Sequence, residues 1–577
     1  MKLNGTLIFI FFTCFFALLF AFLPGLTTDY LRHDDWALAC WETGPIWTHP
    51  LYGQSLGREI RPYTTVLLFY NDYFLNGIEN AKFSKLLSIF LLSISSFLFY
   101  QWLQKFDYNK FWSLVAAIML FTLPPMQIMA SSQHYVFMVF PILLTTITAF
   151  FLWDANTLNT KNIKYVFPLT VFILFSTAVT LSVYLVFYAF VAYTVLQYFY
   201  LRFRVNPTEI NTAIFMYYCS FLLFFTALTG YPMSAMFIWF LLVPPILQLA
   251  HLDNKKEIVS YCIKTTVLVF FVMIFYFIAA KLAYFVFDIN TESLKRNVAI
   301  DLNPIKLITL AIEMLRRSSN LWDITEFYSH APNFFRDYNN LIVITLIFMT
   351  GLWVYVKKIN QTIFSHRKFY LIIFLSVLSL SILAYIPALV SSITSVMYRY
   401  TIAVTPLIGF VVFWSLTQIF EKLPLTNKIK QYSSKFFLII LAIGSILLSN
   451  YTIKNFIVKS NVYEMNYISS IANKEIIPNI KAGDKVTIKY IGGPAHYHAH
   501  LWSEDEFTLS TAAHSWKYIA ILSTLLHKNK INTIEENCMP LYTDQEGAFF
   551  ITSWGTVEVY NYPQSIEKGN MYKKYEN

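Results

Sequence analysis

Long apolar runs separated by short polar stretches dominate the chain, and they predict a bundle of membrane-spanning helices. A helix needs roughly 20 apolar residues to cross a bilayer core about 30 Å thick. About thirteen runs approach this length, at about residues 7–26, 82–103, 111–129, 133–153, 164–180, 183–201, 211–229, 232–250, 260–285, 339–356, 369–390, 396–420 and 435–450. The stretch 164–201 is nearly twice the required length, so we divide it near Thr180–Ser182.

The distribution of Lys and Arg between the runs predicts the orientation of these helices. Six alternate loops hold basic residues: Lys105 and Lys110; Lys161 and Lys164; Arg202 and Arg204; Lys255 and Lys256; Lys357, Lys358, Arg367 and Lys368; Lys422, Lys428, Lys430 and Lys435. The short loops 131–133, 230–232 and 391–395 hold none. Positive charge favours cytoplasmic loops. We therefore expect a cytoplasmic N-terminus, a first run retained as the insertion signal and, after an odd number of spans, an extracytoplasmic C-terminus.

Three extracytoplasmic segments remain outside these runs, at about residues 27–81, 287–339 and 451–577. In the first, residues 63–75 are apolar but too short to span easily, which favours a helix lying at the membrane surface. The last segment reads as short strands at 486–490, 507–510 and 549–560, with glycine-containing turns between them.

The predicted fold class is therefore an all-α polytopic membrane protein of about thirteen transmembrane helices. Residues 1–450 form this membrane domain, and its large outside loops are 27–81 and 287–339. Residues 451–577 form a small extracytoplasmic α/β domain.

Composition supports this class and excludes others. The chain of 577 residues is 56% hydrophobic and only 13% charged, against roughly 25% charged residues in a soluble protein. The net charge of +10 follows from the basic cytoplasmic loops. No basic stripe with interleaved aromatic residues indicates nucleic acid as a partner. The chain has no P-loop, no dinucleotide-binding fingerprint and no nucleophile elbow, so cytosolic nucleotide chemistry is unsupported.

A polar island, His33-Asp34-Asp35-Trp36, follows the first span by about ten residues. A carboxylate there could accept a proton from an attacking hydroxyl, and its neighbour could raise its pKa or hold the acceptor. Asp34 and Asp35 are thus candidate catalytic residues, with Trp36 as a substrate contact. The alternative is a solvated loop or a helix cap, since Asp is common at helix N-termini.

Arginines on the same predicted side could bind a phosphate at the headgroup level, because a guanidinium binds phosphate with two parallel hydrogen bonds. Arg58 and Arg61 lie in the same loop as the island, and Tyr398-Arg399 opens a late span from the outside. An arginine one turn into an apolar helix is costly unless it faces a cavity or an anion. The alternative is anchoring, in which the arginine side chains extend to the headgroups.

Other polar residues have weaker claims. His134 and Tyr184 lie at outside turns as candidate substrate contacts, although each alone is more often a satisfied helix-end residue. Arg316 and Arg317 lie in the second outside loop. His496, His498 and His500 would share one face of a strand and could bind zinc, but a surface or interdomain loop is the better interpretation.

The pattern Asp34-Asp35-Trp36, then Gly57-Arg58 with Arg61-Pro62, then many spans with Tyr398-Arg399, resembles the GT-C superfamily of membrane glycosyltransferases. Within it the chain is most similar to the bacterial Gtr-type glucosyltransferases that decorate O-antigen in lipopolysaccharide. The resemblance covers about residues 1–450. Glu59-Ile60 separates the two arginine pairs, so Arg58 and Arg61 both remain candidates for the family's arginine.

The resemblance implies a sugar donor on a polyprenyl phosphate and a cell-surface glycan or lipid-linked acceptor, at the outer face of a bacterial inner membrane. One aspartate would deprotonate the acceptor hydroxyl, which attacks the anomeric carbon with inversion. Arg399, with Arg58 or Arg61, would stabilise the departing phosphate, and Arg316-Arg317 would close over the donor. No cofactor is required, although a divalent cation (Mg²⁺ or Mn²⁺) between carboxylates and phosphate is compatible.

Two other functions remain open. An O-antigen polymerase or ligase would centre its chemistry on Arg296, Arg316 and Arg317, and the aspartates would be dispensable. A transporter of lipid-linked sugars would need broken helices and ionisable residues at the bilayer midplane. Lys281, near the outer end of its span, is the one candidate for such a residue that the pattern offers.

Overall fold

The computed structural model describes residues 5–30, 80–132, 135–157, 209–248, 255–286, 302–321, 333–358, 366–389, 396, 398–422, 426–471, 473, 489–491, 550–552 and 555–560. Nearly all of them are helical. The helices are α1 (Gly5–Thr27), α5 (Ala81–Gln104), α6 (Lys110–Leu120), α7 (Pro124–Ser131), α8 (Val136–Asn156), α11 (Glu209–Gly230), α12 (Pro232–Ala235), α13 (Phe237–Leu241), α14 (Val243–Gln248), α15 (Lys255–Val286), α17 (Pro304–Ser318), α18 (Asn333–Lys358), α19 (His366–Leu383), α20 (Ile386–Leu389), the 3₁₀ turn η5 (Tyr398–Tyr400), α21 (Val404–Glu421), α22 (Asn427–Thr452), the π-helical η6 (Ile453–Val458) and α23 (Lys459–Ile471).

Seven helices of the described residues are long and apolar enough to cross a membrane, and the bent pair α6–α7 makes an eighth crossing if it is one span. Three shorter apolar segments, Met216–Gly230, Pro232–Gln248 and Tyr370–Leu383, accompany them. The prediction of a helical membrane protein thus agrees with the architecture. The count of thirteen spans stays a prediction, because the runs 164–180 and 183–201 lie outside the described residues.

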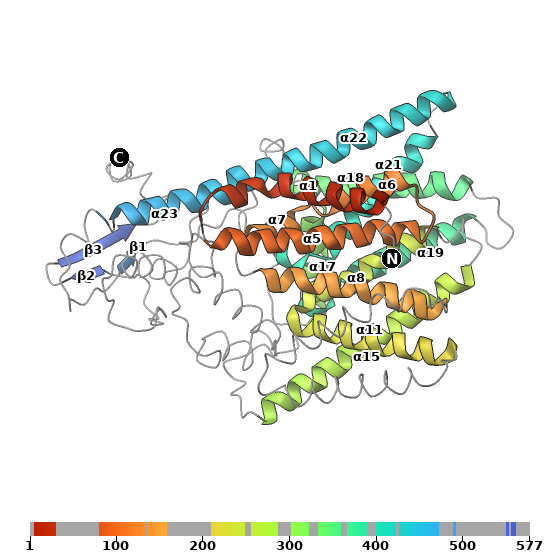
Figure 1. Ribbon diagram of the computed structural model, residues 1–577, viewed down its shortest axis with the longest axis horizontal. Helices are drawn as coiled ribbons and strands as arrows, with labels where there is room; N and C mark the ends of the chain where they lie inside the picture. The colour runs from red at the N-terminus through yellow and green to blue at the C-terminus, as the bar shows by residue number, and fades with distance from the viewer. Residues whose placement is uncertain are drawn as a thin grey trace.

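The helices pack side by side around an apolar core. Figure 1 shows α1, α5, α8 and α11 in successive rows, and the contacts between these helices follow the same order. α22 covers the other side of α1, while α18 packs along α21. The outward faces of α1, α15 and α22 carry exposed phenylalanine, isoleucine and leucine. An apolar outer face around an apolar core is expected of helices that are solvated by lipid.

The span predicted at 111–129 is broken. α6 ends at Leu120, α7 begins at Pro124, and the two axes differ by 59°. Pro124 and Pro125 lack the N–H groups that would continue α6, so the helix stops just before them. Two local side chains replace lost backbone bonds: the Gln127 amide donates to the carbonyl of Thr122 at 2.8 Å, and the Thr122 hydroxyl donates to that of Met119 at 2.8 Å.

Two further predicted spans differ in detail from the structure. Within the run predicted at 232–250, residues 232–248 form three short helices, α12, α13 and α14. In the run predicted at 396–420, we expected Arg399 to lie one turn inside a helix, and this prediction is wrong. Arg399 lies in η5, and α21 begins only at Val404. Pro406 explains this start, because proline is tolerated in the first turn of a helix and not in its interior.

α22, η6 and α23 form one continuous helical rod that extends past residue 450, where we expected the membrane domain to end. Figure 1 shows this rod leading from the bundle toward three short strands. The strands are β1 (Lys489–Ile491), β2 (Phe550–Thr552) and β3 (Gly555–Tyr560). β3 is central, parallel to β1 and antiparallel to β2. All three overlap predicted strands, but the run predicted as one strand at 549–560 holds two antiparallel strands, β2 and β3. The strand predicted at 507–510 and most of the predicted α/β domain lie outside the described residues.

Polar contacts gather at two opposite ends of the bundle. We call the end that holds the last residue of the α1 segment, Tyr30, the outer end, because the sequence predicts it to be extracytoplasmic. At the other, inner end, the Lys105 ammonium contacts the Asp154 carboxylate at 2.5 Å, and the Tyr108 hydroxyl donates to the carbonyl of Pro244 at 2.9 Å. The loops that were predicted to share a side thus lie together.

Candidate functional site

A buried lysine fixes the chain at the outer end of the bundle. Lys85, five residues into α5, is only 1% exposed. Its ammonium donates to the carbonyl of Tyr30 at 2.9 Å and lies 3.4 Å from the centroid of the Tyr30 ring. Burial of an ammonium in an apolar interior is costly unless polar or aromatic groups receive it. The carbonyl and the negative face of the aromatic ring offset part of this cost.

Tyr30 in turn ties α1 to α7. Its hydroxyl donates to the carbonyl of Ser131 at 2.9 Å, near the end of α7, where that carbonyl has no partner within the helix. Gly25 makes room for this arrangement, since a Cβ at that position would lie 3.3 Å from the Tyr30 hydroxyl. The last turn of α1, the first turns of α5 and the end of α7 are therefore held together by one tyrosine and one lysine.

Arg399 lies in the same region. One of its terminal nitrogens donates to the Tyr135 hydroxyl at 3.3 Å, and its guanidinium carbon lies 5.3 Å from the centroid of the Tyr400 ring. Tyr135 immediately precedes α8, and η5 packs against α7 and α12. The guanidinium is part-buried, so its charge is only partly screened by solvent.

These contacts bring together the chain positions that flank several predicted site residues. Tyr30 precedes Asp34 by four residues, and His134 lies between Ser132 and Tyr135 in sequence. Most of the predicted site residues themselves lie outside the described residues: Asp34, Asp35, Trp36, Arg58, Arg61, His134, Tyr184, and likewise His496, His498 and His500. Of Tyr398 the structure describes the backbone, in η5.

The arginine pair predicted to close over the donor forms an ion cluster instead of standing alone. Glu313, one turn earlier on α17, accepts two hydrogen bonds from Arg316, one of them at 2.6 Å, and one from Arg317 at 2.9 Å. Burial alone would raise the pKa of Glu313, but hydrogen bonds and attraction from Arg316 and then Arg317 outweigh it and hold the pKa below its usual range. Glu313 was absent from the sequence prediction.

α17 has two faces. Leu310, Met314 and Arg317 are buried against the bundle, where α17 packs on α18, α20 and α21, while Ile305, Ile308 and Ile312 are exposed. Such a helix, with an apolar face outward and charged groups at its protein-facing edge, is typical of the membrane interface. This places the Glu313–Arg316–Arg317 cluster beside the bundle and not in a loop that stands free of it.

No three His, Cys, Asp or Glu residues gather into a metal-binding cluster within the described part of the chain. Asp34 and Asp35, between which the resemblance allows a divalent cation, lie outside it.

Lys85 is the main residue that sequence reasoning missed. A signal was present: Ser84, Lys85 and Ser88 interrupt an apolar run near its start, and all three are buried. The sequence pattern indicated Lys281 as the ionisable residue within a span. The side chain of Lys281 lies outside the described part of the structure, whereas Lys85 is described and buried. Lys85 lies near the outer end of its helix, so it does not supply the midplane charge expected of a transporter.

No protein-family model matches the chain, and no curated protein is significantly similar to it.

Proposed function

We propose that the protein is an integral-membrane glycosyltransferase. It transfers a sugar from a polyprenyl-phosphate donor to a glycan or lipid-linked acceptor at the outer face of a bacterial inner membrane. Asp34 or Asp35 acts as the base, and Arg399, with Arg58 or Arg61, holds the donor phosphate. The single observation that carries the proposal is the contact network of the outer end, in which Tyr30, Ser131, Tyr135 and Arg399 lie within one packed region.

Covalent geometry limits how far the predicted base can lie from this region. A chain advances at most about 3.6 Å per residue, so the Cα of Asp34 lies within about 14 Å of the Cα of Tyr30. His134 is bonded directly to Tyr135, whose hydroxyl accepts the Arg399 hydrogen bond. Side chains from both halves of the proposed site can therefore reach one lipid-linked sugar.

The chemistry balances with these groups alone. The acceptor hydroxyl oxygen forms a bond to the anomeric carbon while the bond from that carbon to the phosphate oxygen breaks. The aspartate takes the hydroxyl proton, and the polyprenyl phosphate leaves with the bonding electron pair. A part-buried guanidinium stabilises the charge that develops on this phosphate more strongly than the same group would in water. Attack opposite the leaving group inverts the anomeric configuration.

Replacement of the aspartates tests the proposal. Asp34→Asn and Asp35→Asn, singly and together, are expressed in membranes that receive a radiolabelled polyprenyl-phosphate sugar. Loss of the general base should lower transfer by about 10²-fold or more in the double variant, with unchanged membrane insertion. Asp29→Asn is the matched control, because Asp29 is exposed, lies in the same segment and has no role in the proposed mechanism. Wild-type transfer by the double variant would exclude the mechanism.

The same assay separates the alternative of an O-antigen polymerase or ligase. That function would depend on Arg296, Arg316 and Arg317 and would tolerate loss of both aspartates. Arg296 lies outside the described residues, and Arg316 and Arg317 are both hydrogen-bonded to Glu313. Glu313 offsets one of their two positive charges and occupies hydrogen-bond donors of both side chains, which makes them weaker candidates than Arg399 for binding a substrate phosphate.

A further inference from the structure

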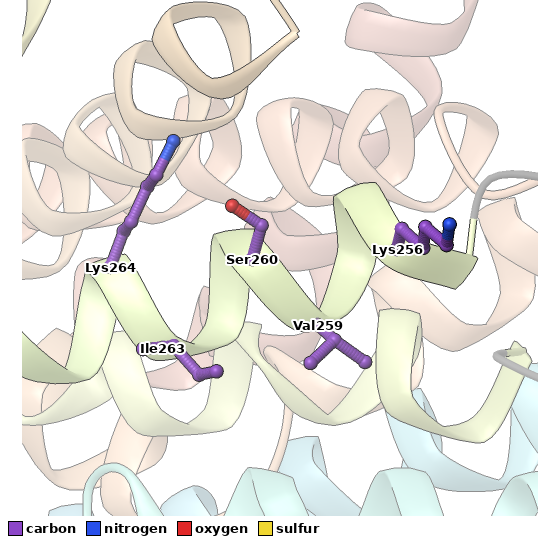
Figure 2. A pocket seen from close by; sticks show the side chains of 5 residues that line it. All are labelled: Lys256, Val259, Ser260, Ile263 and Lys264. Carbon is purple, nitrogen blue, oxygen red and sulfur yellow. The ribbon is translucent and has the colours of Figure 1, made fainter.

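A pocket of about 520 Å³ lies on the flank of α15 at the inner end of the bundle, far from the proposed site in the fold. Five residues from two turns of α15 line it: Lys256, Val259, Ser260, Ile263 and Lys264. Figure 2 shows Ser260 and Lys264 projecting to one side of the helix, with Val259 and Ile263 on the other. The pocket therefore has a polar half and an apolar half.

The polar half is held in place by Asn156 at the end of α8. The Asn156 side-chain oxygen accepts hydrogen bonds from the Ser260 hydroxyl and from the Lys264 ammonium, each at 3.0 Å. Its amide nitrogen donates to the carbonyl of Glu257 at 2.9 Å. One residue of α8 thus aligns a hydroxyl and an ammonium along α15. An ammonium has three N–H donors, so Lys264 keeps donors for a ligand beyond the bond to Asn156.

This half carries two lysines that form no ion pair with any residue in the described part of the chain. Among the described residues, neither Lys256 nor Lys264 has a carboxylate within ion-pair distance, whereas Lys105 at the same end is paired with Asp154. Lys256 and Lys264 are eight residues apart, or about 12 Å along a helix, with Ser260 midway between them. Two flexible lysine side chains can converge on one anion at the level of Ser260.

The apolar half continues along the helix. Val259 and Ile263 are 45% and 59% exposed, and Val267, Phe271 and Ile274 extend the exposed row at steps of three or four residues. This row rises about 22 Å from Val259 to Ile274, which is comparable to most of a bilayer core. A ligand that satisfies both halves needs an anionic head and long hydrocarbon tails.

We propose that this pocket binds the phosphate headgroup of an anionic glycerophospholipid from the leaflet at the inner end, with its acyl chains along the exposed row of α15. Basic residues at the cytoplasmic membrane surface attract anionic lipids at about 1 kcal/mol each, which corresponds to about a fivefold change in affinity per lysine. The proposal is independent of the glycosyltransferase function.

The experiment compares lipids bound to the full-length, detergent-purified protein by native mass spectrometry. Phosphatidylglycerol and phosphatidylcholine with identical acyl chains are added at equal concentration. We expect the wild type to prefer phosphatidylglycerol, Lys256→Gln and Lys264→Gln each to lose about fivefold of this preference, and the double variant to lose nearly all of it. Lys264→Arg should retain it, because the charge remains.

The matched control removes two exposed lysines elsewhere on the predicted cytoplasmic side, Lys422→Gln with Lys435→Gln. This variant should keep the wild-type preference. An undiminished preference in the Lys256/Lys264 double variant would overturn the proposal, as would an equal loss in the control. Displacement of the bound lipid by millimolar inorganic phosphate would also overturn it, since the pocket would then bind a free anion and not a lipid.

Discussion

A single lysine accounts for much of the order at the outer end. Lys85 is buried, and its ammonium joins the carbonyl and the ring of Tyr30. Hydrogen bonds from charged groups contribute about 1.5–3 kcal/mol each, and the aromatic ring adds a cation–π attraction of up to about 2 kcal/mol in a desolvated place. Tyr30 precedes Asp34 by four residues, so Lys85 fixes the chain just before the proposed base.

We predict that Lys85→Met lowers both stability and sugar transfer. The substitution preserves most of the side-chain volume but leaves the Tyr30 carbonyl without the bond from Lys85, at a cost of about 1.5–3 kcal/mol. The measurements are the thermal unfolding midpoint in detergent and the initial rate of transfer. Lys85→Arg, which keeps the charge, should recover part of both.

Lys82→Met provides the comparison, because Lys82 lies one turn earlier on α5 and is exposed. It should leave both quantities unchanged. If Lys85→Met behaved like Lys82→Met, Lys85 would not be an anchor.

At the scale of single residues, the sequence predicts which side chains are charged and on which side they lie, but not which residues they contact. Charge counting assigned Arg399 to the predicted outer side. Its contact with Tyr135, 264 residues away in sequence, depends on how η5 packs against α7 and α12. Likewise the Arg316-Arg317 pair was visible as positive charge, whereas its pairing with Glu313 required α17 to be recognised as a helix, on which residues three and four apart are neighbours.

At the scale of elements, one helix pair, α18 and α21, approaches closely at a glycine. A Cβ added to Gly351 on α18 would lie 2.4 Å from the Cβ and 2.6 Å from the Cα of Ser415 on α21. Small residues permit such approach between membrane helices, where van der Waals packing contributes much of the association energy. The α18–α21 pair therefore depends on this position having no side chain.

We predict that Gly351→Ala destabilises the protein, because the methyl group would force α18 and α21 apart. Overpacking typically costs about 1–3 kcal/mol, and the midpoint of thermal unfolding in detergent should fall accordingly. Gly444→Ala is the control: Gly444 lies on α22, and no atom lies within 4 Å of an added Cβ. That change should be neutral or stabilising by up to about 1 kcal/mol. Equal effects of the two substitutions would contradict the packing argument.

Periodicity and length were sufficient to place most apolar runs on helices, but not to locate their breaks. The length and apolar character of the run 111–129 do not reveal that it is broken into α6 and α7, whose axes differ by 59°. Pro124-Pro125 was a readable signal for that break, as was Pro406 for the late start of α21. The division of 232–248 into α12, α13 and α14 has a weaker signal, because only Pro244 and Pro245 mark it.

At the scale of the whole molecule, the ends of α8 and α11 show on which side of the bundle the chain leaves and re-enters the described residues. Tyr231, after α11, contacts Phe137 at the start of α8 with ring centroids 5.9 Å apart, so α11 ends at the outer end. α8 ends at the inner end, at Asn156. The chain thus leaves and re-enters the described part on the same side. We therefore expect the runs 164–180 and 183–201 to cross the membrane as a pair.

An odd number of membrane crossings, together with the predicted cytoplasmic N-terminus, predicts an extracytoplasmic C-terminus. Seven long helices, one bent pair and three shorter segments would cross eleven times if each is a span, and a further pair keeps the number odd. Alkaline phosphatase, which is active only outside the cytoplasm, should be active when fused after Asn577 and inactive when fused after Asn109, in a predicted cytoplasmic loop. An inactive fusion after Asn577 would mean that the span count is wrong by an odd number.

The continuous rod of α22, η6 and α23 has a consequence for how the protein can vary in length. Each residue of a helix advances the chain by about 1.5 Å and turns it by about 100°. One residue gained or lost between Asn427 and Ile471 would therefore turn the end of the rod by about 100° around its axis, unless a change in the wider winding of η6 compensated for it. A flexible linker would transmit no such rotation. The direction in which the chain leaves the rod at Ile471 is thus set by a residue count.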